Sequence, residues 1–420
     1  MKFSKLAEGV KTSPIITLAA EINEKIQRGE PFYNLTIGDF NPAIFQIPDV
    51  LKTEISKAYN ENETNYPGAK GLPVLRNAVS EFVRKQLGVH YDPLDILVSS
   101  GARPLLYAAY QTIVDPGDKV VFPVPSWNND FYTYLSSGEA VMIETTPAQN
   151  FMPSAEDFQP YIHDAALIVL CSPLNPTGTV MSKEKLEAVC DLVLAENRRR
   201  GDAQKPLYMI FDNIYWQITF GDNIHHNAVA LRPEMRPYAI FVDGLSKCFA
   251  ATGVRVGWSY GPADVTAKMR SLVAHMGSWA PRAEQVASGR FLAQAEAVEA
   301  YMNNFRSEIQ QRLQGFYKGF QALKQQEFTV DAIEPQAAMY LTVQLDLKGL
   351  KTAGGEVLDT NHAVHRYILD EAKVGLVPFS YFGASEESSW YRLSVGTCRL
   401  QDVEVIMSNL QAALSMLKSA

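Results

Sequence analysis

The chain has 420 residues, with 38 basic and 46 acidic side chains and a formal net charge of −8. Since a single hydrophobic core rarely extends beyond about 250–300 residues, this length predicts two domains. The acidic balance and the lack of a basic run argue against a nucleic-acid partner. No apolar run approaches the roughly 20 residues needed to cross a membrane, so we expect no membrane association.

The N-terminus and the cysteines indicate a cytoplasmic protein. The first apolar stretch, residues 14–20, is broken at Glu21 and is too short for a signal peptide. None of the four cysteines is spaced as C-x-x-C, so neither a zinc site nor a redox dithiol is predicted. Few cysteines in a large acidic chain fit a reducing compartment.

Short apolar runs alternate with helical patterns between about residues 95 and 260. This alternation predicts a mainly parallel sheet covered by helices on both faces, a three-layer α/β/α domain. The clearest amphipathic helix between two such runs covers residues 184–199. The strands are expected at residues 96–99, 119–123, 140–143, 166–171, 207–211 and 239–242.

The pattern changes after about residue 295 and predicts a second, smaller α+β domain. Pattern alone does not place the N-terminal segment. If that segment joins the second domain, the large domain spans residues 45–295 and the small one residues 1–44 and 296–420. In the small domain we expect helices at residues 296–326, 362–372 and 401–418 and strands at residues 338–343 and 390–395.

Polar side chains follow three of the expected strands. The strands ending at residues 171, 211 and 242 lead to Asn175, to Asp212 with Tyr215, and to Lys247. Their spacings are 212 − 175 = 37 and 247 − 212 = 35 residues, each about one βα unit. Because ligands bind at the carboxyl ends of parallel strands, we expect an amide, a carboxylate with a phenol, and a lysine in one cleft.

Each of these residues also has a structural explanation. Asn-Pro-Thr-Gly is turn chemistry, Asp212 could cap a helix, and Lys247 could be a surface lysine. The neighbours of Lys247 are small or apolar, however, and this predicts a desolvated lysine that can attack a carbonyl to form a Schiff base. A carboxylate held nearby could keep a pyridine nitrogen protonated.

The segment from Ser99 to Arg103 is a candidate phosphate site. Its small residues lie between an expected strand and the helical run of residues 105–114, where backbone N–H groups can approach an anion. The segment is not a G-x-x-x-x-G-K-[ST] loop, so an ordinary βα turn is the alternative. The chain contains no G-x-G-x-x-G, so a dinucleotide-binding fold lacks its fingerprint.

Together these segments resemble the class I/II aminotransferases, the fold-type I enzymes that depend on pyridoxal 5′-phosphate. The pattern is most similar to the aspartate aminotransferase branch, and the resemblance covers about residues 38–392. It is carried, in the family's order, by Tyr66-Pro-Gly-Ala-Lys-Gly-Leu-Pro-Val-Leu-Arg76, Ser-Gly101-Ala102-Arg103, Pro125-Ser-Trp127, Asn175-Pro-Thr-Gly178, Asp212-Asn-Ile-Tyr215, Ser246-Lys247, Thr252-Gly-Val-Arg255-Val-Gly257 and Arg392-Leu-Ser-Val.

The resemblance implies a role for each matching residue. Lys247 would hold the cofactor and carry the proton, with Asp212 at the pyridine nitrogen and Tyr215 with Asn175 at the phenolic oxygen. Trp127 would stack on the cofactor ring. The phosphate would be bound by the backbone of Gly101, Ala102 and Arg103, by Ser246 and Arg255, and by Tyr66 of the partner subunit in a homodimer with shared active sites.

The resemblance also implies a substrate site. Arg392 would grip the α-carboxylate with its planar guanidinium, and Gly38, Trp127 and Asn175 would line the same side. Arg103 lies where the aspartate branch has a basic residue that reads the distal carboxylate. We therefore expect aspartate and 2-oxoglutarate as the substrate pair, with Arg103 contacting only phosphate or solvent as the alternative.

Two departures and several alternatives remain open. Gly244 stands where the family often has a serine that binds the phosphate, and the usual Gly-Glu-Pro reads Gly38-Asp-Phe-Asn-Pro42.

The alternative functions are an aromatic, alanine or kynurenine-type aminotransferase, a β-lyase or decarboxylase, or a non-catalytic binding module. A binding module would be expected to lose Lys247 or Asp212. His362 and His365 fall short of a zinc ligand count, so we expect an exposed pair and no metal.

Overall fold

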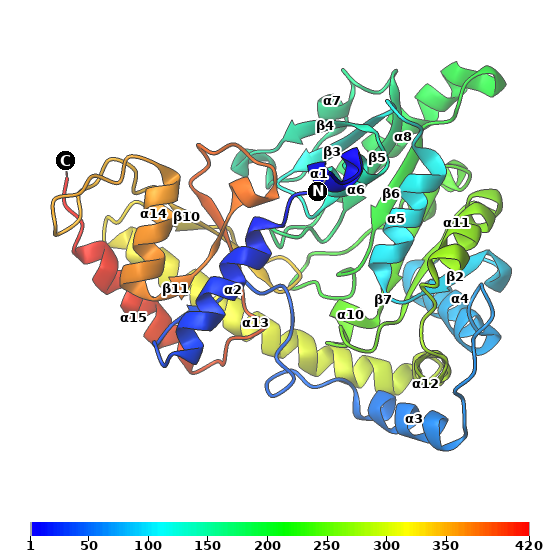
Figure 1. Ribbon diagram of the computed structural model, residues 1–420, viewed down its shortest axis with the longest axis horizontal. Helices are drawn as coiled ribbons and strands as arrows, with labels where there is room; N and C mark the ends of the chain where they lie inside the picture. Colours follow the sequence, from blue (N-terminus) through cyan, green and yellow to red (C-terminus); the bar gives the residue numbers. More distant parts are fainter. Residues whose placement is uncertain (1, 420) are drawn as a thin grey trace.

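The structure is a computed structural model that describes residues 2–419. A seven-stranded sheet forms its centre, in the order β2-β8-β7-β6-β5-β3-β4 (Figure 1). Only β8 runs antiparallel to its neighbours in this sheet, so the predicted mainly parallel sheet is confirmed. The strands are β2 (Ile96–Ser99), β3 (Lys119–Val124), β4 (Glu139–Glu144), β5 (Ala165–Cys171), β6 (Tyr208–Asp212), β7 (Ala239–Gly244) and β8 (Gly257–Tyr260).

Both faces of this sheet are buried. Along β5, Leu167 and Val169 belong to one hydrophobic core and Ile168 and Leu170 to another, since successive side chains of a strand point to opposite faces. Helices cover the two faces, and this confirms the expected α/β/α layers. The first core includes α5 (Ala102–Ile113) and α11 (Ala263–Met276), and the second includes α4 (Pro73–Leu87), α8 (Lys183–Arg200) and α12 (Arg282–Leu292).

Residues at the helix ends explain where several helices begin and stop. Pro73 occupies the first turn of α4, and Gly88 ends the helix with φ +70°. This asymmetry is common because proline needs no N–H partner there and glycine tolerates the left-handed region. The Ser182 side chain accepts a hydrogen bond from the Lys185 backbone N–H and so caps α8.

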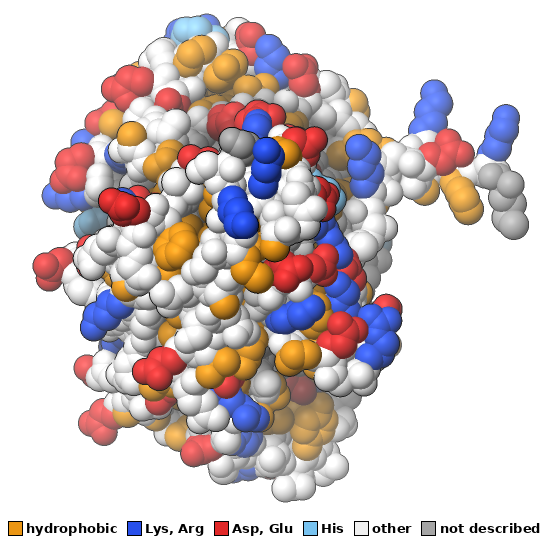
Figure 2. Space-filling view, turned by 90° about the vertical axis from the view of Figure 1, so that its left-hand side faces the viewer, with side chains coloured by type: hydrophobic (Ala, Val, Ile, Leu, Met, Phe, Trp, Pro, Cys, Tyr) orange, Lys and Arg blue, Asp and Glu red, His pale blue; other side chains and the backbone are white. Residues whose placement is uncertain are grey.

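A second, antiparallel sheet lies beside the large one. It is formed by β9 (Val330–Ala332), β10 (Tyr340–Leu345), β12 (Val377–Pro378) and β13 (Trp390–Ser394). The long helix α13 (Ala295–Gln325) runs from α15 (Asp402–Ser415) to α12 and links the two regions (Figure 1). In the view of Figure 2, acidic and basic side chains are interspersed over the face shown.

The N-terminal segment packs against the C-terminal region. The short strand β1 (Tyr33–Asn34) pairs in parallel with β11 (Val374–Gly375). Lys25 of α2 (Pro14–Gln27) lies 3.0 Å from Asp370, and Glu21 lies 2.9 Å from Arg366. These contacts join the two ends of the sequence, and the domain boundaries at residues 45 and 295 stay a prediction.

Two local details differ from the sequence-based expectations. The expected helix 362–372 is α14 (Asn361–Tyr367) followed by a π-helical turn, Ile368–Ala372. The prediction that His362 and His365 form an exposed pair is wrong, because His365 is buried and its Nε2 lies 3.1 Å from the Leu376 carbonyl oxygen.

Among residues 2–419, no helix combines the length and apolarity required to span a bilayer.

Candidate active site

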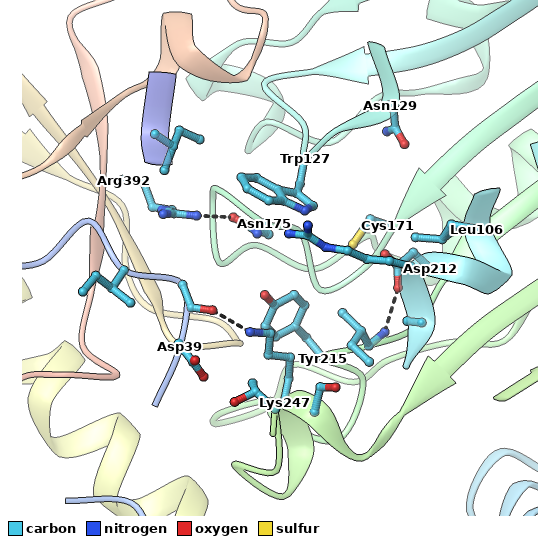
Figure 3. A pocket seen from close by; sticks show the side chains of 18 of the residues that line it. Asp39, Leu106, Trp127, Asn129, Cys171, Asn175, Asp212, Tyr215, Lys247 and Arg392 are labelled. Carbon is cyan, nitrogen blue, oxygen red and sulfur yellow. Dashed lines mark hydrogen bonds between the residues drawn. The ribbon is translucent and has the colours of Figure 1, made fainter. Parts of the chain in front are cut away.

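A cavity of about 620 Å³ opens at the carboxyl ends of β5, β6 and β7. Its walls also include the N-terminal segment and β13, so both ends of the sequence complete it. Figure 3 shows Arg392 and Asp212 on opposite sides of this cavity, with Trp127, Asn175 and Tyr215 between them. The predicted residues that line it are Gly38, Ala102, Arg103, Trp127, Asn175, Asp212, Tyr215, Ser246, Lys247, Arg255 and Arg392.

Lys247 lies in the short helix α10 (Leu245–Cys248), directly after β7. Its ammonium donates a hydrogen bond to the Gly38 carbonyl oxygen at 2.5 Å. The pKa of Lys247 is lowered to about 8, mainly by burial, with Asp39 opposing the shift and the charges of Arg103, Arg255 and Arg392 adding to it. A larger neutral fraction near neutral pH makes this amine a competent nucleophile and base.

Asp212 is the last residue of β6 and faces the cavity across from Arg392. Its carboxylate accepts a hydrogen bond from the Ile214 backbone N–H at 3.1 Å. Burial raises the pKa of Asp212 to about 6. Among the described residues the Asp212 carboxylate forms no ion pair, and a buried carboxylate in that condition is suited to a cationic ligand atom.

Arg392 is almost fully buried on β13, with 1% of its surface exposed. Its guanidinium donates to the Asn175 side-chain oxygen at 2.8 Å and to the Thr36 carbonyl at 2.5 Å. Its Nε has no hydrogen-bond partner among the described residues. A buried guanidinium without a carboxylate partner, facing a cavity, fits an anionic group of a ligand.

Tyr215 and Asn175 line the cavity, and each is hydrogen-bonded to a further residue, Tyr340 and Arg392 respectively. Asn175 belongs to the loop after β5, and its side-chain oxygen is held by Arg392. The Tyr215 hydroxyl lies 2.7 Å from that of Tyr340, on the first residue of β10. Burial raises the pKa of Tyr215 well above its ordinary value, so the phenol stays protonated and can donate a hydrogen bond.

The start of α5 forms an anion-binding corner. Gly101 precedes this helix with φ +96°, and a Cβ atom there would overlap the Arg255 guanidinium. The Arg255 guanidinium donates to the carbonyl oxygens of Thr252 and Ser100, at 2.8 and 2.6 Å. Ser246, Arg255 and the free N–H groups of α5 therefore present donors to one corner of the cavity.

Gly244, the position where the family often has a phosphate-binding serine, is closed to any side chain. A Cβ atom there would lie 2.9 Å from both Gly257 Cα and the Val256 carbonyl oxygen. This crowding follows from the pairing of β7 with the antiparallel strand β8, which puts Gly244 opposite Gly257. The missing ligand at Gly244 is therefore part of how these two strands pack.

Arg103 and Trp127 meet at the side of the cavity. The Arg103 guanidinium carbon lies 5.3 Å from the centre of the Trp127 ring, an arrangement that orients an otherwise exposed arginine. With Lys247, Arg255 and Arg392, Arg103 makes the cavity lining more cationic than anionic, since Asp39 and Asp212 are its acidic members. Such a lining favours ligands that carry several negative charges.

Two predicted residues do not line this cavity. Gly101 lies just behind it, where it makes room for Arg255. Tyr66 is 82% exposed and its ring packs edge-on against Trp279 at 5.4 Å. Its reach toward the phosphate of a partner subunit stays a prediction.

Several residues of the site were missed from the sequence. Asp39 and Thr36 come from the N-terminal segment, and Tyr340 comes from β10. Tyr340 fell within an expected strand, but strand alternation alone does not show which tyrosine faces a ligand. Cys171 lines the cavity beside Asp212, and the only signal for it was its position at the end of an expected strand.

The residues of the cavity fit pyridoxal 5′-phosphate. They include a desolvated lysine, a buried carboxylate without a cationic partner, and an anion-binding corner at a helix N-terminus. The volume of about 620 Å³ is typical of pockets for molecules of this size. Fold and site together define an α/β protein whose cavity suits this cofactor.

Comparison with known proteins identifies the family. The model for aminotransferases of class I and II matches residues 30–410. The chain therefore belongs to the class I and II aminotransferases, and it is a transferase that uses pyridoxal 5′-phosphate.

Similar proteins cover nearly the whole chain. An aspartate aminotransferase of Bacillus sp. (strain YM-2) is 29% identical over 401 residues, which are 93% of this chain and 95% of that protein. A bifunctional aspartate aminotransferase and glutamate/aspartate-prephenate aminotransferase of Petunia hybrida is 28% identical, over 100% of this chain and 83% of its own.

Solved structures show the same fold. The aspartate aminotransferase from Thermus thermophilus with maleate has a TM-score of 0.86 at 25% identity, over 98% of this chain and 100% of that chain. An aspartate aminotransferase from Rhizobium meliloti has a TM-score of 0.90 at 24% identity and covers both chains completely, which shows a shared fold.

Proposed function

We propose that this aminotransferase takes its amino group from a dicarboxylic amino acid, aspartate, and passes it to a 2-oxo acid such as 2-oxoglutarate. The observation that carries the proposal is the presence of two arginines in one cavity with Lys247. Arg392 and Arg103 both line it, and neither forms an ion pair among the described residues. Two guanidinium groups can bind the two carboxylates of such a substrate.

The same cavity can hold the cofactor through the residues expected from the sequence. Lys247 would carry it covalently, Asp212 would face its ring nitrogen, and Tyr215 with Asn175 would face its phenolic oxygen. Trp127 would cover the ring. When bound, pyridoxal 5′-phosphate supplies an electron sink for the bonds at the substrate α-carbon. The phosphate would lie at the backbone of Gly101, Ala102 and Arg103, beside Ser246 and Arg255.

The chain's own residues then orient the substrate and move its proton. Arg392 would fix the α-carboxylate, because its guanidinium is already held by Asn175 and the Thr36 carbonyl. Lys247, with its pKa of about 8, can be neutral near physiological pH and can accept a proton at Nζ. Ile15 of α2 lines the same cavity as a buried side chain and would exclude water from the reacting atoms.

The names of similar proteins support this substrate class. The relatives from Bacillus and Petunia are an aspartate aminotransferase and a bifunctional enzyme that also acts as one, and the Thermus enzyme was solved with maleate, a dicarboxylate. The alternative substrates are aromatic amino acids, alanine and kynurenine. They differ from aspartate because they offer no distal carboxylate for Arg103 to bind.

Steady-state kinetics on aspartate, glutamate, alanine, phenylalanine and kynurenine tests the proposal. Arg103→Ala should lower kcat/KM for aspartate and glutamate by about 10- to 100-fold, the worth of one charged hydrogen bond, and leave alanine nearly unchanged. Arg103→Lys should recover part of the loss, and Arg198→Ala on the surface of α8 serves as the control. An aspartate preference that survives in Arg103→Ala would refute the proposal.

We also propose a cytoplasmic homodimer with shared active sites. The exposed Tyr66 ring, which does not line the cavity of its own chain, supports a role across an interface. The four free thiols support a reducing compartment.

The proposed domains are a large one, residues 45–295, and a small one formed by residues 1–44 and 296–420. Sedimentation would give the number of subunits, and Tyr66→Phe should weaken cofactor retention in a dimer.

A further inference from the structure

A second buried tyrosine lies between the cofactor side and the carboxylate side of the cavity. Tyr340 has no exposed surface, and its hydroxyl lies 2.7 Å from the Tyr215 hydroxyl. The two rings pack edge-on, with centres 5.6 Å apart and planes at 70°. Neither the sequence pattern nor the family motifs pointed to Tyr340.

The backbone around Tyr340 is held on both sides. Two residues before it, the Ala338 N–H donates to the Ile218 carbonyl at 2.8 Å, and two residues after it, Thr342 Oγ1 donates to the Thr177 carbonyl at 2.8 Å. A Cβ atom at Gly178 would overlap the Tyr340 carbonyl oxygen. The start of β10 is therefore fixed against the loops that carry Asn175 and Tyr215.

The Tyr340 ring also touches the carboxylate side of the site. It is the diagonal cross-strand neighbour of Arg392, because Tyr340 pairs with Ser394. The Arg392 guanidinium carbon lies 4.8 Å from its ring centre. A Cβ atom at Gly38, whose carbonyl binds Lys247, would lie 3.0 Å from the Tyr340 hydroxyl. The Tyr340 phenol thus lies beside Arg392, Tyr215 and Gly38, the residues proposed to contact the substrate, the cofactor and Lys247.

Geometry decides which phenol donates. Tyr215 lines the cavity, and its hydroxyl is the only hydrogen-bond partner of the Tyr340 hydroxyl among residues 2–419. The titratable or charged groups near Tyr340 are Arg392 from β13, Tyr215, Cys171 from β5 and Asp39 from the N-terminal segment. Burial raises the pKa of both phenols, so both are neutral at physiological pH and each has one proton to donate. If Tyr215 gives its proton to a ligand in the cavity, the proton between the two hydroxyls comes from Tyr340.

We propose that Tyr340 is a positioning residue that donates its hydroxyl proton to the Tyr215 oxygen. The Tyr215 oxygen then accepts a hydrogen bond and keeps its own proton. This proton points away from Tyr340 and into the cavity. Hydrogen bonds in such a chain strengthen one another, so Tyr215 becomes a better donor to the phenolic oxygen of the cofactor. This inference rests on the proposed contact of Tyr215 with that oxygen.

The pH titration of the visible absorption of the holoenzyme tests the inference. A donor at the phenolic oxygen stabilises its anionic form and lowers the pH midpoint of the titration. Tyr340→Phe removes the hydroxyl and keeps the ring over Arg392. The midpoint should therefore rise by about half a pH unit, which corresponds to a fraction of the free energy of one hydrogen bond. Tyr391→Phe is the matched control, because this buried tyrosine bonds the Asn361 carbonyl, away from the cavity.

A double-mutant cycle shows whether the effect passes through Tyr215. Tyr340→Phe should no longer move the midpoint in a Tyr215→Phe background, since the acceptor is gone. This double variant leaves no unpaired hydroxyl, and melting temperatures of all four proteins verify folding. An unchanged or lowered midpoint in folded, yellow Tyr340→Phe overturns the inference. A wild type that stays colourless with added pyridoxal 5′-phosphate would instead refute the proposed function.

Discussion

The ammonium of Lys247 and the backbone carbonyl of Gly38 lie 2.5 Å apart, although 209 positions of sequence separate them. This hydrogen bond joins the end of the central sheet to the N-terminal segment, which also supplies Thr36 to Arg392. Both the lysine and the arginine of the site are therefore oriented by the same few residues. The N-terminal segment forms one wall of the cavity, and a change in its position would reach both side chains.

Replacing Lys247 should stabilise the cofactor-free protein while abolishing activity. The Lys247 pKa falls from 10.5 to about 8 on folding, a difference of 10.5 − 8 = 2.5 units. Below pH 8 the buried ammonium therefore costs stability, by up to about 3 kcal/mol, and the cost disappears as pH rises from 8 to 10.5 because the unfolded chain then binds more protons.

Thermal unfolding of cofactor-free Lys247→Met and wild type measures this cost. The variant should melt higher at pH 7, and the two melting curves should converge near pH 10.5. With added pyridoxal 5′-phosphate, only the wild type should turn yellow. Equal melting temperatures at pH 7 would show that the ammonium is solvated and that its pKa is not depressed.

Asp212→Asn should have the same opposing effects on stability and activity. Burial raises the Asp212 pKa from 3.8 to about 6, so the folded chain binds more protons between these values and stability falls as pH rises through them. The neutral amide should therefore stabilise the cofactor-free protein above pH 6.

The amide should also lower kcat/KM by about 100-fold or more, because it cannot hold a protonated ring nitrogen as a carboxylate can. Melting curves at pH 5 and 8 and aspartate kinetics check the two parts. Asp212→Asn with full activity would remove Asp212 from the proposed site.

Arg392→Lys should weaken every amino-acid substrate, in contrast to Arg103→Ala. A lysine has one charged nitrogen and cannot donate to Asn175 and the Thr36 carbonyl while it also binds a carboxylate. We expect kcat/KM to fall by about 10- to 100-fold for alanine and aspartate alike. A loss confined to aspartate would mean that Arg392 reads the distal group.

Gly244→Ser, which restores the residue common in the family, should destabilise this protein. The new side chain would meet Gly257 and Val256 at 2.9 Å, and such overpacking costs about 1–3 kcal/mol. Urea unfolding of this variant should show the loss, while Gly354→Ser, where the nearest neighbouring atom lies 3.8 Å away, should unfold like the wild type. Tighter cofactor binding by an equally stable Gly244→Ser would contradict this account of the strand packing.

The central sheet was predictable because local sequence determines it. The buried strands are continuous apolar runs such as that of β5, and their side chains need no partner to reveal that they are buried on both faces. The missed strand β8 reads Gly-Trp-Ser-Tyr, without such a run, and it is held by pairing with β2 and β7. His365 was assigned to the surface because the helical pattern does not show that its ring meets the Leu376 carbonyl oxygen, 11 positions further along the chain.

The sequence by itself determined which residues can carry the chemistry. Asn175, Asp212 and Lys247 each follow a strand at intervals of one βα unit, so a parallel sheet alone brings them to one edge. Tertiary structure decided what shares the cavity with them: the Gly38 carbonyl on Lys247, Thr36 on Arg392, and Tyr340 beside Tyr215. Such contacts join segments 125 to 356 residues apart, and no local pattern of apolar and polar residues encodes a pairing at that range.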